Sequence, residues 1–224
     1  MMEMTGIKRH YEMASGVVKA LDGIDLQVKA GERLLLLGPS GSGKTTLLNC
    51  IAALDSPTEG TYSFEGNPVP RNAAEQMTTF RRDTIGFVFQ NFNLLQDLTV
   101  LENVLLIQEI AGVIDEKRAR ELLILVGLEN EIDRFPAEIS GGQQQRVAIA
   151  RSIAKKPKLL LGDELTGSLD SKTSETVMEV LVKACEAENI TTVMVTHDES
   201  LAKYATRVVR LDSGLILSDN PIEN

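Results

Sequence analysis

A glycine-rich stretch early in the chain has the residue types that bind phosphate groups, Gly38-Pro39-Ser40-Gly41-Ser42-Gly43-Lys44-Thr45-Thr46. It fits the pattern G-x-x-x-x-G-K-[ST]. Glycines let the backbone turn tightly and direct N–H groups at phosphate oxygens. We expect Lys44 to reach the β- and γ-phosphates as a point charge and the Thr45 hydroxyl to bind Mg²⁺, while Ser40 and Thr46 add hydroxyl donors. The alternative is a glycine turn before an ordinary helix.

The residues on either side of this stretch indicate a strand, a loop and a helix. An apolar run, Leu34-Leu35-Leu36-Leu37, precedes it, and the helical pattern of residues 47–52 follows it. The N-terminus of such a helix favours anions, because its first N–H groups are unpaired and its dipole is positive there. The context therefore favours a phosphate-binding loop.

Two further segments carry the residue types for phosphate chemistry. Asp163-Glu164 follows the apolar run of residues 159–161. A carboxylate there can hold Mg²⁺, and the next can orient and deprotonate an attacking water; a surface acidic pair is the alternative. Ser140-Gly141-Gly142-Gln143 begins a second glycine-rich helix, with Ser140 as its N-cap. The phosphate loop already supplies one nucleotide site in this chain. A second glycine-rich helix start therefore indicates that this segment binds the nucleotide of another copy of the chain. The alternative is that Ser140 only caps the helix.

The apolar patterns along the chain predict an α/β fold. Apolar strands at residues 159–163 and 191–195 alternate with helical stretches, which is typical of a mainly parallel sheet with helices on both faces. Residues 98–154 read as helical, with Asp115 as the cap of one helix. The apolar stripe of that helix consists of Ala119, Leu122, Leu123 and Val126. Gln90, Asp163 and His197 fall at strand ends, where such sheets bind ligands.

Composition restricts the possible classes of protein. The chain has 224 residues and a net charge of −9, which argues against non-specific binding to nucleic acid or anionic lipid. No apolar run approaches the ~18 residues of a membrane span, and the first residues lack the apolar core of a secretory signal. Cys50 and Cys185 lie in apolar helical patterns and are expected to be reduced, buried thiols. With two His and no Cys-x-x-Cys, a transition-metal site is not expected.

In their order along the chain, these motifs resemble those of the ATP-binding cassette ATPases. The phosphate loop runs from Gly38 to Thr45, and Gln90 stands where the family has its Q-loop glutamine. Residues 139–143 match the signature, and Ser168-Leu169-Asp170 matches the D-loop. His197 matches the switch histidine. Tyr11 lies where the family places an aromatic ring that stacks on adenine; a half-exposed strand residue is the alternative.

The resemblance implies a fold and a mechanism. The fold would be a P-loop NTPase (RecA-like) core with a mainly parallel sheet, an N-terminal antiparallel β region and an inserted α-helical subdomain. The whole chain would form one nucleotide-binding domain, with a core of residues 1–92 and 155–224 and a helical subdomain of about residues 93–154. ATP and Mg²⁺ would be the cofactors, with Thr45, Gln90 and Asp163 at the metal. Glu164 would act as the base, assisted by Gln90 and His197.

The resemblance also implies partners. Two copies would face head to tail and sandwich two ATP molecules, each bound by the phosphate loop of one copy and residues 140–143 of the other. Asp170 would tie the two sites together. A separate transmembrane permease would dock near residues 90–99 and hold the chain at the cytoplasmic face of the inner membrane.

Several stretches resemble the lipoprotein-releasing, macrolide-export and cell-division branch of that family, among them Gly86-Phe87-Val88-Phe89-Gln90 and Thr99-Val100-Leu101-Glu102-Asn103-Val104. Three departures stand out. Ile139 replaces the usual Leu, Leu165 stands where Pro is usual, and Gly162 where Ala is frequent. The last two put the positioning of Glu164 in question. Two alternatives stay open: a regulator of the cell envelope without transport, and a soluble ATPase acting on nucleic acid or ribosomes.

Overall fold

The structure is a computed structural model that describes residues 1–14 and 16–222. The chain divides into two compact units, one of Met1–Arg81 with Thr191–Asn224 and the other of Arg82–Ile190. Within the described residues, no helix combines the length and the apolar character that a membrane crossing requires.

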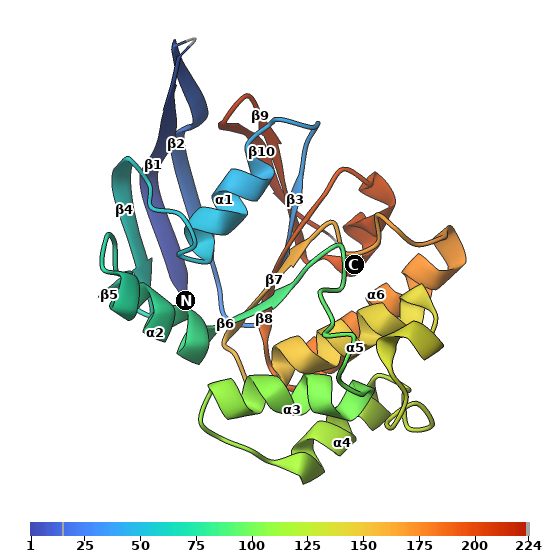
Figure 1. Cartoon of the computed structure of the whole chain (residues 1–224). Coiled ribbons are helices and arrows are strands. Elements are labelled where there is room, and N and C mark those ends of the chain that lie inside the picture. Colours follow the sequence, from blue (N-terminus) through green and yellow to red (C-terminus); the bar gives the residue numbers. More distant parts are fainter. Residues whose placement is uncertain (15, 223–224) are drawn as a thin grey trace. The chain divides into compact units, whose positions relative to one another are not determined.

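An antiparallel sheet occupies one side of the first unit (Figure 1). It consists of β1 (Met2–Met13), β2 (Gly16–Val28), β4 (Glu59–Phe64) and β5 (Asn67–Pro68), in the order β2-β1-β4-β5. Met2, Met4 and Ile7 of β1 are at most 2% exposed, while the residues between them are more accessible. One face of this sheet is therefore buried, and the N-terminal antiparallel β region is confirmed.

Parallel strands of the first unit position the phosphate loop. β3 (Arg33–Leu37) pairs in parallel with β8 (Thr191–Thr196) and with β9 (Arg207–Asp212). β10 (Leu215–Pro221) runs antiparallel to β9 at the edge. The four leucines of β3 are at most 1% exposed, and burial of each contributes roughly 1.5–3 kcal/mol. This apolar anchor fixes the point at which the chain leaves the sheet.

Three helical segments complete this part of the fold. α1 (Lys44–Ile51) packs against β2 and β8. α2 (Ala74–Thr84) places Phe80 edge-on to Tyr62 and Phe64, with ring centroids 6.4 and 5.6 Å apart. The 3₁₀ helix η2 (Glu199–Tyr204) follows β8.

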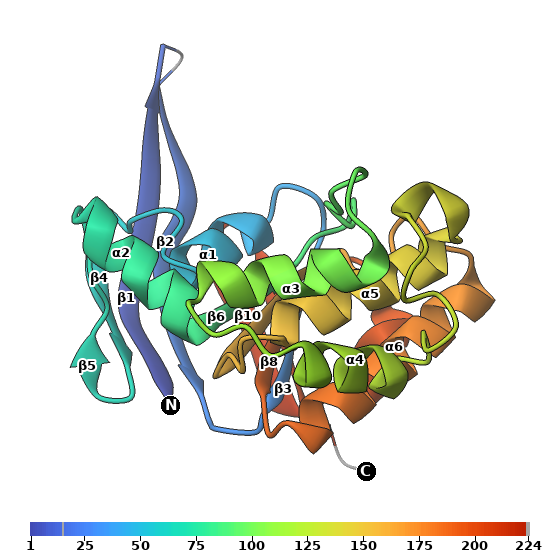
Figure 2. The ribbon, with the colours of Figure 1, turned by 60° about the horizontal axis from the view of Figure 1, so that its bottom comes forward.

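The second unit is mainly helical. It contains the parallel pair β6 (Ile85–Val88) and β7 (Leu159–Asp163). Its helices are α3 (Val100–Ile110), α4 (Glu116–Leu125), the 3₁₀ helix η1 (Pro136–Glu138), α5 (Gly141–Ile153) and α6 (Ser171–Ala187). α5 packs against α3, α4 and α6, as Figure 2 shows.

Local signals in the sequence explain where these helices begin. The Asp115 carboxylate accepts a hydrogen bond from Arg118 N and caps α4, as predicted. The predicted apolar stripe of residues 119, 122, 123 and 126 is fully buried. Cys50 and Cys185 are both buried, each 1% exposed.

Candidate active site

The phosphate loop joins β3 to α1 through a backbone that only glycine accommodates at key points. Gly43, which precedes α1, has φ +101°, and a Cβ there would lie 2.4 Å from the Ala20 carbonyl oxygen. Among the described residues, no side chain caps α1 and no acidic residue lies in its first turn. The helix therefore presents unpaired N–H groups and its positive end to an anion.

Lys44 lies inside this loop. Its side-chain nitrogen donates to the carbonyl oxygens of Gly38 and Pro39, both at 2.8 Å, and the residue is only 7% exposed. These contacts hold the ammonium beside the start of α1. The shape of the loop and the charge at its centre fit a polyphosphate group.

The other predicted loop residues differ in accessibility. Ser42 is 2% exposed, and its backbone carbonyl accepts a hydrogen bond from Gly214 N at 3.1 Å, so it ties the loop to the β9–β10 turn. Ser40, Gly41 and Thr45 are exposed, and Thr46 is half-buried. The two hydroxyls predicted to face the phosphates and the metal, Ser40 and Thr45, are thus accessible.

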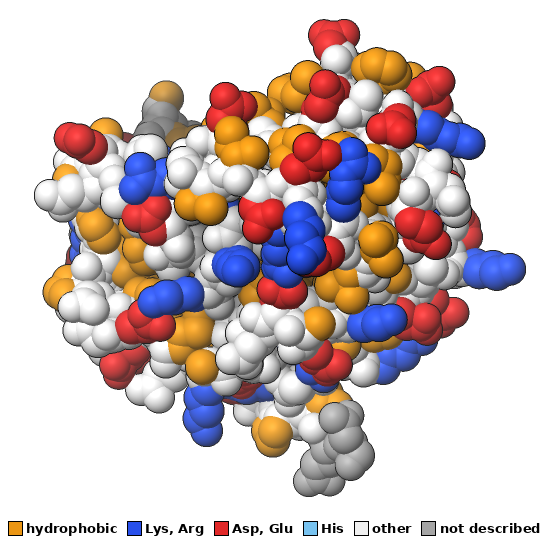
Figure 3. Space-filling view, turned by 90° about the horizontal axis from the view of Figure 1, so that it is seen from below, with side chains coloured by type: hydrophobic (Ala, Val, Ile, Leu, Met, Phe, Trp, Pro, Cys, Tyr) orange, Lys and Arg blue, Asp and Glu red, His pale blue; other side chains and the backbone are white. Residues whose placement is uncertain are grey.

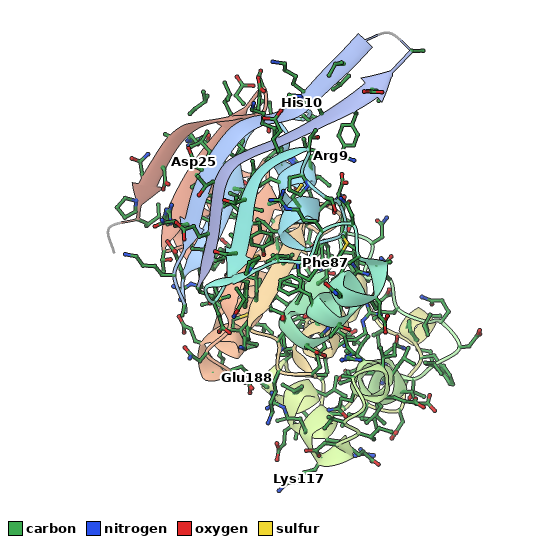
Figure 4. The ribbon with its side chains drawn as sticks, turned by 90° about the vertical axis from the view of Figure 1, so that its left-hand side faces the viewer. Arg9, His10, Asp25, Phe87, Lys117 and Glu188 are labelled. Atoms are coloured by element: carbon green, nitrogen blue, oxygen red, sulfur yellow. The ribbon has the colours of Figure 1, made fainter. Side chains whose placement is uncertain are left out.

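Tyr11 belongs to a cluster that the sequence did not reveal. Its hydroxyl donates to Asp55 Oδ2 at 2.7 Å, and Arg9 Nε donates to the same oxygen at 2.8 Å. The Arg9 guanidinium lies 4.3 Å from the centroid of the Tyr11 ring. Figure 4 labels Arg9 on β1. Burial alone would raise the pKa of Asp55, but the hydrogen bonds from Arg9 and Tyr11 outweigh it and lower that pKa.

His197 directly follows β8, as predicted, and is exposed. The next residue, Asp198, caps η2 by accepting a hydrogen bond from Ser200 N at 2.9 Å. This cap fixes the chain direction just after the histidine. The histidine, the phosphate loop and Tyr11 all lie in the first unit.

The predicted metal and base residues end β7 in the second unit. Asp163 is the last residue of the strand, and Glu164 follows it with a left-handed φ of +49°. Gly167 N donates to the Glu164 carbonyl oxygen at 3.1 Å and closes a tight turn. A Cβ at Gly167 would lie 2.9 Å from Gln90 Nε2, so Gln90 packs against the turn that carries Glu164. The structure therefore places Gln90 beside the turn that begins at Glu164.

The signature residues begin α5 as predicted. The Ser140 side chain accepts from Gln143 N at 3.3 Å, and the Gln143 side chain accepts from Ser140 N at 2.8 Å. This reciprocal pair is a capping box. Gly141 and Gly142 form the first turn of the helix, directly after the cap.

Signature and D-loop meet through Thr173. Asp170 caps α6, accepting hydrogen bonds from Thr173 N at 3.1 Å and from Thr173 Oγ1 at 2.6 Å. These bonds lower the pKa of Asp170, those from Thr173 contributing most. A Cβ at Gly142 would lie 2.3 Å from Thr173 Cγ2. The absence of a side chain at Gly142 therefore lets α5 and α6 approach closely at their starts.

Sequence reasoning missed Arg9, Asp55 and Thr173. Each acts through a contact with a residue that the motifs did identify. Asp55 lies 44 residues from Tyr11, and no local pattern links the two. Thr173 is the third residue of α6, and Asp170 is the N-cap of that helix. The sequence motif identified Asp170 only as a D-loop residue. The Asp-x-x-Thr spacing, which is typical of a helix N-cap, could have identified Thr173.

Comparison with known proteins identifies the family. The profile described as "ABC transporter" matches residues 21–167. The lipoprotein-releasing system ATP-binding protein LolD of Geobacter metallireducens is 45% identical over 225 residues, which cover 98% of this chain and 99% of that protein. The macrolide export ATP-binding/permease protein MacB of Syntrophobacter fumaroxidans is 45% identical over 221 residues, 96% of this chain but 31% of its own length. The chain thus spans about a third of this larger relative.

A solved structure agrees with the fold. The dimeric structure of a post-hydrolysis state of the ATP-binding cassette MJ0796, bound to ADP and Pi, superimposes with a TM-score of 0.89 at 40% sequence identity and covers 100% of both chains. Because the family profile matches residues 21–167 and a relative at 45% identity covers nearly the whole chain, this chain belongs to the ABC transporter family and is one of its ATP-hydrolysing cassettes.

Proposed function

We propose that the phosphate loop binds the triphosphate of ATP and that Lys44 neutralises its charge. The observation that carries this proposal is the Lys44 ammonium held by two loop carbonyls beside the uncapped start of α1. Phosphoryl transfer depends mainly on positioning and charge neutralisation, and this loop supplies both. Tyr11 would stack on the adenine ring with the face opposite Arg9.

Mg²⁺ is the metal that suits the proposed donors. Thr45, Gln90 and Asp163 offer a hydroxyl, an amide and a carboxylate oxygen, which are the hard ligands that Mg²⁺ prefers together with phosphate oxygens. Within the described residues, no group of three or more His, Cys, Asp and Glu side chains is placed to hold a metal. The ion would supply charge neutralisation at the phosphates.

Glu164 is proposed as the general base and His197 as a donor to the γ-phosphate. The left-handed backbone of Glu164 supports the first assignment, because strained conformations of non-glycine residues concentrate at functional sites. Gln90, packed beside the same turn, would contact the metal and the attacking water. A carboxylate held at hydrogen-bonding distance from that water can accept its proton.

The cassette is proposed to act as a head-to-tail homodimer. Ser140 to Gln143 of one copy would bind the nucleotide held by the phosphate loop of the other, and Asp170 would link the two sites. The solved MJ0796 cassette is dimeric, which supports a dimer of this chain. The capped, glycine-rich start of α5 offers N–H groups to such a phosphate.

A separate transmembrane permease is proposed to dock at residues 90–99 and to hold the chain at the cytoplasmic face of the inner membrane. Arg151 supports this segment by donating to the Phe92 carbonyl oxygen at 2.7 Å and to that of Asn93 at 2.5 Å. The exposed side chains of Phe89 and Leu95 would meet the partner. We propose lipoprotein, macrolide or peptide as the cargo, and the names of the LolD and MacB relatives support the first two.

The single nucleotide-binding domain with a core of residues 1–92 and 155–224 and a helical subdomain of about residues 93–154 stays a prediction. A cell-envelope regulator that transports nothing would use the same ATPase chemistry and the same membrane partner. An ATPase of nucleic acid or ribosomes is disfavoured by the net charge of −9. Basic and acidic side chains are interspersed on the face shown in Figure 3.

Co-purification tests this proposal. The tagged chain is expressed in its native host, membranes are gently solubilised, and the captured proteins are identified. A membrane subunit with a large extracytoplasmic domain is expected. Its loss in a variant that changes residues 91–99, keeps Gln90 and still hydrolyses ATP would locate the docking segment. Capture of ribosomal or DNA-repair proteins without a membrane subunit would contradict the proposal.

A further inference from the structure

We propose that Gly162, Leu165 and Gln145 form one positioning unit for Glu164, in which the missing side chain at 162 makes room for the leucine at 165. The inference rests on the proposed role of Glu164 as the base. It concerns two of the three departures from the pattern that the chain resembles: Gly162, where Ala is frequent before the aspartate, and Leu165, where Pro is usual after the glutamate.

The first observation is steric. A Cβ added at Gly162 would lie 2.7 Å from Leu165 Cδ1, 2.8 Å from Cγ and 3.0 Å from Cδ2. Side-chain carbons do not approach each other so closely, so an alanine at 162 requires Leu165 to move. The two departures therefore fit each other.

The second observation is that Leu165 has little freedom to move. Its side chain is only 3% exposed. Its carbonyl oxygen accepts a hydrogen bond of 2.8 Å from Gln145 Nε2, and Gln145 is fully buried. Swinging the leucine away would disturb the packed core or this buried hydrogen bond.

The third observation connects this unit to Glu164. Leu165 is bonded directly to Glu164, whose φ of +49° lies in the left-handed region. A proline at 165 would favour an extended backbone at the preceding residue, whereas leucine imposes no such restriction. The hydrogen bond between Gly167 N and the Glu164 carbonyl oxygen closes the turn on the other side.

The consequence is that the anchoring of Leu165 sets the direction of the Glu164 carboxylate. A displacement of about 1 Å at a reacting group can lower a rate by about a hundredfold. Binding of ATP through the phosphate loop does not depend on that displacement. A shift of Leu165 should therefore lower kcat while the affinity for ATP stays nearly unchanged.

The experiment is a double-mutant cycle on the full-length chain. Gly162→Ala, Leu165→Ala and the double variant are compared with the natural protein for kcat, for ATP affinity by fluorescent-nucleotide titration, and for thermal stability. Gly162→Ala alone is expected to lower kcat about tenfold or more with ATP affinity within about twofold. In the double variant, the Leu165 atoms that would collide with the Cβ of an alanine at 162 are absent. Its kcat is therefore expected to lie within about threefold of the kcat of Leu165→Ala.

Gly86→Ala is the matched control. Gly86 lies on β6, where a Cβ would be 2.6 Å from the Ser152 carbonyl oxygen, so alanine there also creates a steric conflict. It is expected to reduce stability without the selective loss of kcat at unchanged ATP affinity. An equal selective loss in this variant would show that any strain in the sheet has this effect and would overturn the inference.

Two further variants make the outcome decisive. If Gly162→Ala does not fold, recovery of folding in the double variant supports the steric pair, and failure of both to fold contradicts it. Gln145→Met is expected to lower kcat selectively by removing the hydrogen bond to Leu165 O. If Glu164→Gln hydrolyses ATP at the natural rate, the assignment of Glu164 as the base is wrong. If Glu164→Gln is inactive while the effects of Gly162→Ala and Leu165→Ala on kcat are additive, the base is supported and only the positioning unit is wrong.

Discussion

The Tyr11 hydroxyl donates a hydrogen bond of 2.7 Å to Asp55, and the same carboxylate oxygen holds Arg9 against the ring of Tyr11. One aromatic face is thus occupied by a guanidinium and the ring is fixed at its edge. A nucleobase can stack only on the remaining face. The cluster converts a half-buried strand residue into an oriented platform.

The first prediction concerns this platform. Tyr11→Ala should weaken ATP binding by about 5- to 150-fold, because base–aromatic stacking contributes about 1–3 kcal/mol. Asp55→Asn should weaken it less, since the ring is retained but less well fixed. Titration with a fluorescent ATP analogue measures both, and Tyr11→Phe separates the ring from the hydroxyl. Unchanged affinity in Tyr11→Ala would remove Tyr11 from the nucleotide site.

The second prediction separates binding from chemistry. Lys44→Ala should lose ATP binding because the loop loses its central positive charge. Glu164→Gln should bind ATP, lower kcat by about a hundredfold or more, and remain dimeric in ATP. Light scattering after size-exclusion chromatography measures the dimer. A monomeric Glu164→Gln in saturating ATP would argue against the nucleotide sandwich.

The third prediction tests the contact between signature and D-loop. Gly142→Ala should impair ATP-dependent dimerisation, because its Cβ would lie 2.3 Å from Thr173 Cγ2. Thr173→Ser removes that methyl group but keeps the hydroxyl that donates to Asp170. The double variant should therefore recover most of the dimerisation that Gly142→Ala loses. Lack of recovery would show that the glycine serves the partner's nucleotide directly and not the packing of α5 on α6.

Local motifs predicted the parts of the site that depend on neighbouring residues. The glycine spacing before Lys44 and the cap at Ser140 could be identified because turn geometry and capping are decided within a few residues. The pairing of Gly162 with Leu165 escaped prediction although the two are close in sequence. Their contact depends on how the turn after β7 folds back, and composition does not encode that.

Contacts between elements that are distant along the chain could also not be predicted from the sequence. Asp55 meets Tyr11 only because β1 and the segment after α1 lie together in the first unit. Met2–Met13 forms a full strand, whereas the sequence indicated only an N-terminal antiparallel region. Pairing with β2 and β4 supplies its hydrogen bonds, and a sequence pattern does not contain that pairing.

The fourth prediction concerns Asn103, which is fully buried in α3. Its Nδ2 lies 3.0 Å from the carbonyl oxygens of Leu95, Leu98 and Thr99, and its Oδ1 accepts from Leu95 N at 2.9 Å. Asn103→Leu should lower the free energy of unfolding by about 3 kcal/mol, because several buried backbone groups lose their partner. Urea denaturation measures this loss.

A second variant at this position bears on the docking segment. If residues 90–99 bind the permease, an Asn103→Asp protein that still folds should hydrolyse ATP alone but capture less of the membrane subunit. Equal capture by this variant and the natural protein would place the docking surface elsewhere.

The fifth prediction concerns thiol chemistry. Burial, reinforced by the charge of Asp55, raises the pKa of Cys50 to about 12. Since the thiolate is the reactive form, a raised pKa keeps Cys50 unreactive from pH 7 to 9. Titration with a thiol reagent should find neither Cys50 nor Cys185 in the native protein and both in urea. Rapid native labelling at pH 8 would contradict the buried positions.

The fit between Gly162 and Leu165 also has an evolutionary consequence. A chain with alanine at 162 and a small residue at 165 can exchange the alanine for glycine at little cost, and then accept leucine. If leucine is introduced at 165 first, the intermediate protein has both alanine at 162 and leucine at 165, whose side chains collide. Substitution histories at these sites should therefore be ordered in time, and Gly162→Ala without a change at residue 165 should damage the enzyme.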